Sequence, residues 1–255
     1  SEMCIRDRGT GGAPLLDALQ RYGVDTGLIR ALDQPCGHTV IQVTEAGENC
    51  ILLYGGTNAC LTESFVDETL CRFAPGDVLL LQNEVNGIPY LIRQAVRRGL
   101  RVAFNAAPMA PEVADYPLEL LSWLVINEGE GAALAGTQAP ADILDRLAQR
   151  CPDTQLLLTL GAGGSVCRAG GETWSCGVFP VRPVDTTAAG DTFLGYYLGA
   201  LLAGAPIPEA LRLSSAASAL CIQRRGAADA IPLLEEVRAA LAAGSLGEMG
   251  KGASL

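Results

Sequence analysis

A run of small residues between two carboxylates is the part of this sequence best suited to chemistry. Residues 185–191 are Asp-Thr-Thr-Ala-Ala-Gly-Asp, and they lead directly into the apolar stretch 192–202. Small residues let a backbone turn tightly and approach a ligand closely. A following helix directs unpaired N–H groups and its positive dipole end toward the turn. The pattern therefore predicts an anion-binding site at the start of a helix near residue 192.

A carboxylate lies inside this predicted anion site. Asp191 would repel a resting anion, but it could take a proton from an attacking hydroxyl group. An anion site beside a base is what transfer of a phosphoryl group to an alcohol requires. The alternative interpretation is that Asp191 is only a favourable first-turn charge, which stabilises a helix by about 0.3–1 kcal/mol.

Composition narrows the classes of function. The chain has 255 residues, enough for one α/β domain, and a formal net charge of −10, which disfavours nucleic-acid and anionic-membrane partners. It has no run of about 18 apolar residues, so we expect no membrane-spanning helix. The nine cysteines are scattered without a Cys-x-x-Cys pair, which indicates neither a zinc site nor a redox motif and favours a reducing cytoplasm.

Two scarce residues exclude further classes. His38 is the only histidine, and no Gly-x-Ser-x-Gly motif supports a hydrolase that would use it. Lys251 is the only lysine and lies in a Gly-rich segment, whereas a P-loop kinase or a protein kinase needs a lysine in a defined motif. A phosphoryl transferase with this sequence must neutralise charge with backbone N–H groups, metal ions and arginine.

Apolar runs alternate with helical patterns along the chain, which is typical of a mostly parallel sheet covered on both faces. The predicted strands are 77–82, 101–105, 121–126 and 155–160, and the predicted helices are 89–98, 141–150, 192–203, 208–223 and 232–243. Ligands gather at the carboxyl ends of such strands. Glu84, Asn105, Asn127 and Gly161 each follow a strand, so we expect them on one rim of the sheet.

Residues 37–54 have a different pattern. Two apolar runs, 39–43 and 50–54, flank the polar turn 45–49, which predicts a β-hairpin.

The segment 185–191 resembles the second signature of the ribokinase family of carbohydrate kinases, which includes fructokinases, ketodeoxygluconate kinases and adenosine kinase. The resemblance covers residues 12–241 and is strongest to the ribokinases. Further segments match family landmarks in family order: 82–84 (Gln-Asn-Glu), 105–108 (Asn-Ala-Ala-Pro), 127–130 (Asn-Glu-Gly-Glu), 159–164 (Thr-Leu-Gly-Ala-Gly-Gly) and 225–227 (Arg-Gly-Ala). It implies a ribokinase-like three-layer α/β sandwich with a mostly parallel central sheet and a small β lid.

The resemblance also implies domains and an activity. The kinase core would comprise residues 9–36 and 55–255, and the hairpin 37–54 would be part of the lid, through which the parent enzyme forms a homodimer. The implied reaction is ATP-dependent phosphorylation of a sugar primary hydroxyl, D-ribose to D-ribose 5-phosphate. Another sugar kinase of the family, such as a fructokinase or ketodeoxygluconate kinase, and a noncatalytic nucleotide-binding remnant remain alternatives.

Site residues carried over from the family include a catalytic base and its surroundings. Asp191 would remove the proton from the sugar, and the N–H groups of Ala188, Ala189 and Gly190 would form the anion hole. Glu84 would bind sugar hydroxyls, although on its own it could be only a polar residue that begins a loop.

The nucleotide site implied by the family lies in the second half of the chain. Asn127 would lie at the phosphates and Glu130 would orient Mg²⁺ through water. The same Asn-x-x-Glu spacing is a capping box, and the two roles can coexist. The implied ATP-binding residues are Asn127, Thr159, Leu160, Gly161, Ala162, Gly163, Gly164, Gly190, Asp191 and Ser215.

The glycine loop 159–164 has two other interpretations. One is a plain glycine turn. The other is the dinucleotide fingerprint of an NAD-type oxidoreductase, which is disfavoured because its third glycine position holds Val166 and the strand pair 165–168 and 173–177 follows instead of a helix.

A monovalent-cation site is also implied by the resemblance. Its ligands would be the side chains of Asp185 and Thr187 and backbone oxygens of Cys221, Arg224 and Gly226. A further position of the set, commonly serine, is Ala230 here, so we expect weakened dependence on K⁺.

The first residues depart from the family. Family members carry a first strand, other lid strands and a sugar-binding loop ahead of the position of Gly12. Residues 1–8 match nothing in the family and are interpreted as foreign sequence joined to a truncated frame. We therefore expect part of the sugar site to be absent.

Overall fold

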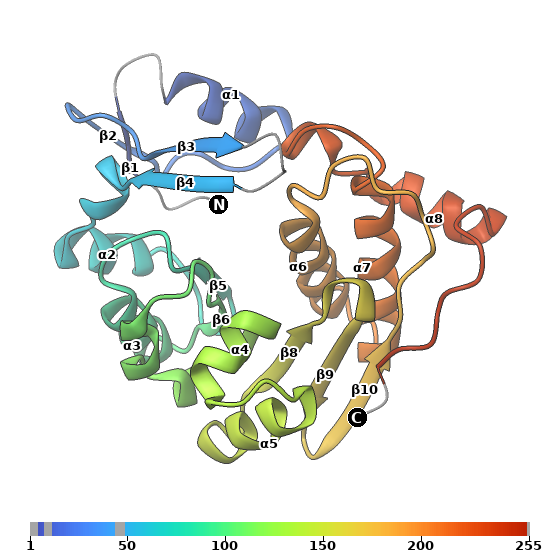
Figure 1. The fold of residues 1–255 in the computed structure, drawn as a ribbon. Coiled ribbons are helices and arrows are strands. Elements are labelled where there is room, and N and C mark those ends of the chain that lie inside the picture. Colours follow the sequence, from blue (N-terminus) through green and yellow to red (C-terminus); the bar gives the residue numbers. More distant parts are fainter. Residues whose placement is uncertain (1–4, 8–11, 44–48, 254–255) are drawn as a thin grey trace. The chain divides into compact units, whose positions relative to one another are not determined.

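The computed structural model describes residues 5–7, 12–43 and 49–253 (Figure 1). The chain divides into two compact units, Ser1–Leu121 and Ser122–Leu255. Residues 45–48 of the expected hairpin turn, and residues 1–4 and 8 of the segment interpreted as foreign, lie outside the described residues. The proposed division into core and lid stays a prediction.

The first unit combines short strands with helices. Its elements are β1 (Ile5–Asp7), α1 (Ala13–Arg21), β2 (Arg30–Leu32), β3 (His38–Val43), β4 (Asn49–Tyr54), η1 (Gly56–Ala59), α2 (Glu63–Leu70), β5 (Val78–Gln82), α3 (Ile88–Arg97), β6 (Arg101–Asn105), η2 (Pro111–Asp115) and η3 (Leu118–Leu120). Strands β5 and β6 are parallel, with Gln82 opposite Asn105 at their carboxyl ends. Helix α3 connects them and buries the apolar side chains of Ile88, Leu91 and Ile92. This is the expected βαβ unit.

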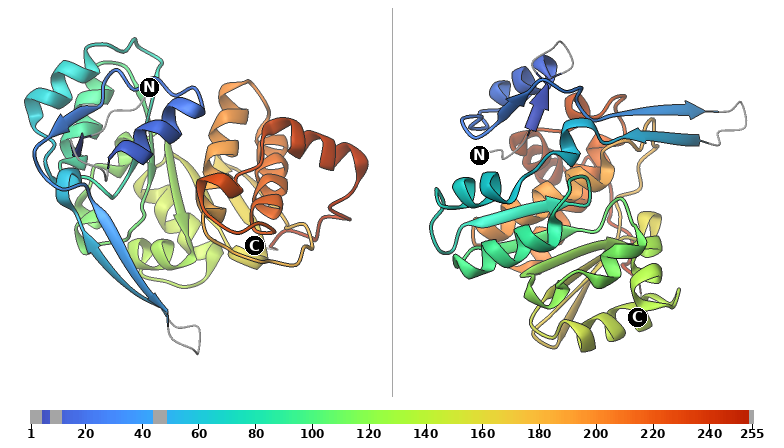
Figure 2. Two further views of the ribbon diagram at one scale, coloured as in Figure 1. Left: turned by 90° about the horizontal axis from the view of Figure 1, so that it is seen from above. Right: turned by 90° about the vertical axis from the view of Figure 1, so that its left-hand side faces the viewer.

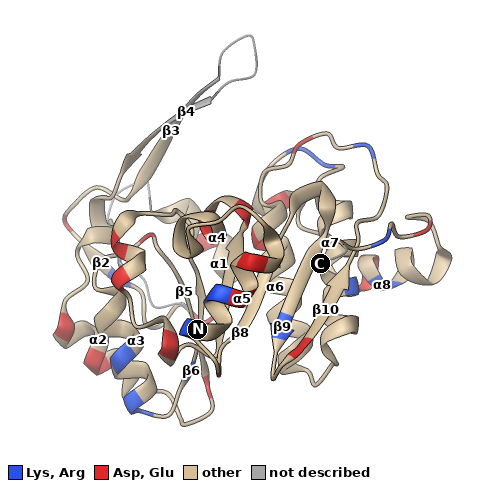
Figure 3. Ribbon diagram, turned by 60° about the horizontal axis from the view of Figure 1, so that its bottom comes forward, with Lys and Arg blue, Asp and Glu red and all other residues tan. Residues whose placement is uncertain are grey.

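The expected hairpin is confirmed by the antiparallel pairing of β3 and β4, with Val40 opposite Leu52 and His38 opposite Tyr54. Figure 2 shows these strands projecting as an arm away from α2 and α3 of the same unit. Neither strand contains Asp, Glu, Lys or Arg, whereas α2 and α3 carry interspersed charges (Figure 3). All four of these paired side chains are exposed.

The second unit contains the rest of the chain. Its elements are β7 (Trp123–Asn127), α4 (Glu128–Ala135), α5 (Pro140–Arg150), β8 (Gln155–Thr159), η4 (Gly161–Gly163), β9 (Ser165–Ala169), β10 (Glu172–Cys176), α6 (Ala189–Leu202), α7 (Ile207–Cys221), η5 (Ala228–Ala230) and α8 (Leu234–Ala243). Strands β7 and β8 are parallel, and β8, β9 and β10 follow in antiparallel order. The continuous apolar runs of β7 and β8 are buried, as expected for strands covered on both faces. The α/β prediction is confirmed.

Helix α6 begins earlier than the sequence suggests. The apolar stretch predicts a start near Thr192, but the helix begins at Ala189 because the Thr192 N–H already donates to the Ala188 carbonyl oxygen (2.9 Å). Asp191 therefore lies within the first turn of α6 and not ahead of it. The unpaired N–H groups of a helix start belong to this same turn.

Candidate functional site

The turn that leads into α6 has an unusual backbone. Ala188 caps the helix with φ at 58°, the one non-glycine residue with positive φ among those described. The left-handed conformation costs a residue with a Cβ about 1–2 kcal/mol. Such strain persists only where surrounding contacts fix it, and it concentrates at functional sites.

Side chains and backbone groups from α7 fix this turn. Ser218 donates its hydroxyl to the Ala189 carbonyl oxygen (2.9 Å), and the Val184 N–H donates to the Ile222 carbonyl oxygen (2.7 Å). The turn is therefore fastened to the end of a helix that packs against α6. The fastening supplies the contacts that hold Ala188 in its strained conformation.

One N–H group of the predicted anion hole already donates a hydrogen bond within the turn. The Ala189 N–H donates to the Thr186 carbonyl oxygen over 3.3 Å, which is a long hydrogen bond. Gly190 is exposed, and a Cβ added to it would meet nothing within 4 Å. Space for a ligand therefore exists at Gly190 and beside the exposed Asp191, where the dipole of α6 favours negative charge.

Asp185 organises the cation residues expected from the family resemblance. Its two carboxylate oxygens accept the backbone N–H groups of Thr187 (2.9 Å) and Gly226 (3.1 Å). Hydrogen bonds from Thr187, and then from Gly226, lower the pKa of Asp185 to about 2. The carboxylate thus stays ionised and links the two loops that would surround a cation.

The other predicted cation residues lie at the same junction. The Cys221 thiol contacts the Thr187 carbonyl oxygen at 3.9 Å, and the Cys221 carbonyl oxygen accepts the Arg224 N–H at 3.0 Å. Ala230 is 1% exposed, so the position of the expected serine is buried. An ionised carboxylate among backbone carbonyl groups suits a hard monovalent cation.

Asn127 and Glu130 form the predicted capping box at the start of α4. The Asn127 side chain accepts the Glu130 N–H (2.9 Å), and Glu130 accepts the Asn127 backbone N–H (2.8 Å) and side-chain amide (2.8 Å). Burial raises the pKa of Glu130, and the hydrogen bond from the Asn127 backbone opposes that rise. The capping interpretation is confirmed, and a role toward a metal ion stays a prediction.

The chemistry of these donors fits an indirectly held Mg²⁺. Each Glu130 oxygen accepts one hydrogen bond from Asn127 and retains a lone pair for a water molecule. Within the described part of the chain, no three His, Cys, Asp or Glu side chains gather closely enough to hold a metal ion. Mg²⁺ bound mainly by nucleotide phosphates and water requires no such cluster.

The glycine loop lies beside Asn127. Thr159 ends β8 opposite Asn127 at the end of β7, and the loop then forms the short helix η4 and enters β9. A Cβ at Gly164 would lie 2.1 Å from the Cys176 carbonyl oxygen, so only glycine fits there. A strand follows this loop, and the dinucleotide fingerprint requires a helix at that point, so the oxidoreductase interpretation fails.

The loop 159–164 offers an exposed backbone. Gly161, Ala162 and Gly163 are exposed, whereas Leu160 and Gly164 are buried and joined by the Leu160 N–H, which donates to the Gly164 carbonyl oxygen (2.8 Å). The closed base of the loop therefore presents its small residues outward.

Ser215 is less accessible than the resemblance suggests. Its hydroxyl donates to the Gly177 carbonyl oxygen (2.8 Å), and the side chain is only 6% exposed. The hydroxyl is therefore engaged with the backbone next to the end of β10, and a contact of Ser215 with the nucleotide stays a prediction.

Glu84 lies in the first unit, in the turn between β5 and α3, and is exposed. The turn is held by its neighbours Asn83 and Asn86, whose side chains bond to other segments of the same unit. The side-chain amides of Asn83 and Asn86 each donate to a carbonyl oxygen 25 residues away along the chain, so no local spacing predicts these two hydrogen bonds.

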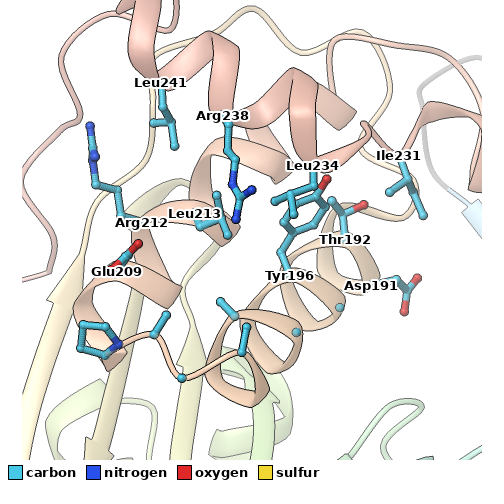
Figure 4. Close-up of a pocket in the computed structure, with 17 residues that line it drawn as sticks. Asp191, Thr192, Tyr196, Glu209, Arg212, Leu213, Ile231, Leu234, Arg238 and Leu241 are labelled. Atoms are coloured by element: carbon cyan, nitrogen blue, oxygen red, sulfur yellow. The ribbon is translucent and has the colours of Figure 1, made fainter.

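A cavity of about 780 Å³ runs along α6 from Asp191 toward α7 and α8 (Figure 4). Thr192 lines it, and the hydroxyl of Thr192 is buried with no hydrogen-bond partner. Figure 4 shows Asp191 and Thr192 at one end and Arg212 and Arg238, from α7 and α8, farther along. Sequence reasoning missed this cavity because its lining comes from three helices.

Comparisons with known proteins indicate the same family as the sequence motifs. A model of the pfkB family, described as carbohydrate kinase, matches residues 9–234. A ribokinase from Schizosaccharomyces pombe is 32% identical over 245 residues, which cover 92% of this chain and 76% of the relative. A ribokinase from Haemophilus influenzae is 33% identical over 232 residues, which cover 88% of this chain and 76% of the relative.

Solved structures show the same similarity. A ribokinase from Thermotoga maritima gives a TM-score of 0.78 at 29% identity and covers 93% of this chain and 80% of its own. The structure of Arabidopsis thaliana ribokinase complexed with ribose and ATP gives a TM-score of 0.79 at 26% identity, with 94% and 80% covered. The ribokinase-like α/β fold is thereby confirmed. Among the described residues, no helix is both long enough and apolar enough to cross a membrane.

Proposed function

Because this chain belongs to the pfkB family of carbohydrate kinases, we propose that it transfers the γ-phosphoryl group of ATP to the primary hydroxyl of D-ribose. The product would be D-ribose 5-phosphate. The observation that carries this proposal is the position of Asp191 in the first turn of α6, directly after the strained Ala188. The relatives named as ribokinases support ribose as the acceptor.

Asp191 is the proposed general base. Its carboxylate accepts the proton of the sugar hydroxyl while the sugar oxygen bonds to the γ-phosphorus and the bond from that phosphorus to the leaving oxygen of ADP breaks. Negative charge that develops on the transferred group would meet the N–H groups at the start of α6, with Gly190 giving the closest access. Mg²⁺ bound with the nucleotide would neutralise charge on the phosphates.

The nucleotide would lie along the exposed loop 161–163 and the end of β7. The side-by-side ends of β7 and β8 support this position, since they bring Asn127 and Thr159 together. Glu130, held by Asn127, would orient water on Mg²⁺. Asp185 and Thr187, with the backbone oxygens of 221, 224 and 226, would hold K⁺ more weakly than in a relative with serine at position 230.

The hairpin would pair with a second copy of the chain. Its strands β3 and β4 are uncharged, and Val40, Leu52 and Tyr54 are each about half exposed. An apolar surface of this kind favours association. We also propose a cytoplasmic setting, where ATP is available and free thiols such as those of Cys71 and Cys167 stay reduced.

An acceptor panel tests the proposed reaction. ADP release from Mg-ATP is measured by coupled assay with D-ribose, D-fructose and 2-keto-3-deoxygluconate, and the position of the phosphate is assigned by phosphorus NMR. We expect the highest kcat/KM for ribose, with phosphate on the primary hydroxyl. Preference for another sugar would replace ribose as the acceptor, and Mg-ATP binding without transfer to any sugar would overturn the catalytic proposal.

A further inference from the structure

The turn that carries Glu84 is fastened firmly at its first residue. The backbone N–H of Asn83 donates to the Ala107 carbonyl oxygen (2.8 Å), and its side-chain amide donates to the Pro108 carbonyl oxygen (2.9 Å). The side-chain oxygen of Asn83 accepts the hydroxyl of Tyr116 (3.0 Å). This end of the turn is therefore fixed to the segment that follows β6.

The other end of the same turn is fastened to a different segment. Asn86 accepts the Leu61 N–H (2.9 Å) with its side-chain oxygen and donates its side-chain amide to the Leu61 carbonyl oxygen (2.9 Å). The backbone N–H of Asn86 donates to the Asn58 carbonyl oxygen (3.3 Å). The side-chain amide of Asn86 thus makes the same pair of hydrogen bonds with Leu61 that the backbone of a neighbouring strand makes. Glu84 lies between Asn83 and Asn86, the two ends of the turn that these hydrogen bonds hold.

The segment held by Asn86 continues directly from the base of the hairpin. Helix η1 follows β4, and the Thr57 N–H in η1 donates to the Pro35 carbonyl oxygen (3.0 Å), which lies just ahead of β3. A Cβ on Gly56 would lie 2.4 Å from the Pro35 oxygen, and one on Gly37 would lie 2.8 Å from the Gly55 oxygen. The two ends of the hairpin therefore meet backbone to backbone, and only glycine permits that approach.

We propose that Asn86 is a positioning residue that couples the hairpin β3–β4 to the carboxylate of Glu84. A displacement of the hairpin base moves the segment 56–61, and the paired bonds between Asn86 and Leu61 pass that displacement to the turn. Asn83 keeps the opposite end of the turn in place, so the displacement reorients Glu84 and does not carry the whole turn with it. This inference rests on the proposed function to the extent that Glu84 binds the sugar.

Asn83 supplies a matched control, because its replacement loosens the same turn from the side that is not joined to the hairpin. Asn86→Ala and Asn83→Ala are each compared alone and combined with Gly37→Ala, which strains the hairpin base. We expect each single change to raise KM for ribose about tenfold, as the loss of one or two hydrogen bonds would, and to leave KM for ATP unchanged.

The double variants show whether Asn86 couples the hairpin to Glu84 or whether each substitution only weakens sugar binding independently. Asn86→Ala with Gly37→Ala should raise KM for ribose no further than the larger single effect, whereas Asn83→Ala with Gly37→Ala should multiply the two effects to about a hundredfold. Asn86→Asp, which sets a carboxylate oxygen against the Leu61 carbonyl oxygen, should raise KM for ribose at least as much as Asn86→Ala. Multiplicative effects in both pairs, or a parallel rise in KM for ATP, would overturn the coupling.

Amide hydrogen exchange tests the coupling without any turnover. Asn86→Ala should speed exchange about tenfold both in residues 83–87 and in residues 55–61, whereas Asn83→Ala should speed it in residues 83–87 only. Unchanged exchange in residues 55–61 of Asn86→Ala would overturn the proposal. A protein that phosphorylates no sugar but shows the expected exchange pattern would overturn the proposed function and leave the coupling supported.

Discussion

Strand β7 of the second unit buries its apolar side chains, whereas helix α1 and the hairpin of the first unit leave theirs more exposed. In the second unit, β7 buries Trp123, Leu124, Val125 and Ile126, and its last residue, Asn127, is exposed at the candidate site. In the first unit, helix α1 has no buried residues, and the hairpin leaves large apolar side chains about half exposed. Helices α2 and α3 and strand β6 of the first unit also bury apolar side chains, so the contrast lies in the hairpin. An exposed apolar surface such as that of the hairpin favours association.

Different contacts therefore fix the geometry of the two halves of the proposed site, the loops that transfer the phosphoryl group and the turn that binds the sugar. The loops 159–164 and 185–191 end on buried strands and helices of their own unit, so intramolecular packing sets their geometry. The position of Glu84 depends on the side-chain hydrogen bonds of Asn83 and Asn86. We propose that it also depends on the hairpin, whose apolar side chains are about half exposed. We therefore expect the phosphoryl-transfer half to respond to single side chains alone, and the sugar half to respond both to its two asparagines and to association.

The largest effect is expected in the second unit. Asp191→Asn should lower kcat by about 10²–10⁴-fold, because the amide cannot accept the proton of the sugar hydroxyl. Binding of Mg-ATP, measured by calorimetry, should persist because most of the proposed nucleotide contacts come from other loops and the backbone N–H groups at the start of α6 are unchanged by the substitution. Asp153→Asn, at an exposed turn of the same unit, is the matched control. Transfer to ribose at the wild-type rate by Asp191→Asn would remove Asp191 from the mechanism.

A smaller effect should follow from disrupting the hairpin surface. Val40 and Leu52 lie opposite each other on one face, and Thr39 and Leu53 lie on the other face. Leu52→Glu places a charge in the proposed contact and should halve the mass measured by light scattering, with a several-fold rise in KM for ribose and none for ATP. Thr39→Glu, on the opposite face, should change neither quantity. A wild-type mass equal to that of one chain would refute association through the hairpin.

A modest gain is expected at the cation loops. Ala230 is buried where a serine oxygen would complete the expected ligand set, so Ala230→Ser should lower the KCl concentration for half-activation severalfold. The rate is measured against KCl with choline chloride holding ionic strength constant, and Ala228→Ser, two residues earlier in η5, is the control. An unchanged half-activating concentration would count against a monovalent-cation site in these loops.

Regular elements and local motifs could be predicted from the sequence. Strands β6 and β8 are apolar runs that end in a polar residue, and helix α5 has an apolar face, so their bounds were predicted to within one residue. The capping box of Asn127 and Glu130 needs only a spacing of three residues. These features depend on near neighbours in the chain, which a sequence displays directly.

Features that depend on distant partners could not be predicted. The start of α6 at Ala189 follows from the left-handed Ala188, and that conformation is fixed by Ser218 and by loop contacts of Asp185. The burial of Ser215 against Gly177 likewise needs the packing of α7 beside β10. No spacing in the sequence encodes such pairs, because their members meet only after the elements have folded.

The smallest effect concerns the acid stability of the second unit. The pKa of Asp185 is lowered from 3.8 to about 2 by its hydrogen bonds, so ionised Asp185 stabilises the fold above about pH 4 and loses that contribution as pH falls toward 2. Asp185→Asn lacks the contribution at every pH. The variant should therefore unfold at lower urea concentration than wild type at pH 6, and the difference should shrink steadily between pH 4 and about 2. Choline buffers without K⁺ exclude cation binding as the cause, and Asp153→Asn is again the control. A difference that stays constant down to about pH 2 would show that Asp185 stabilises its loops through the shape of its side chain, and that its charge plays no part.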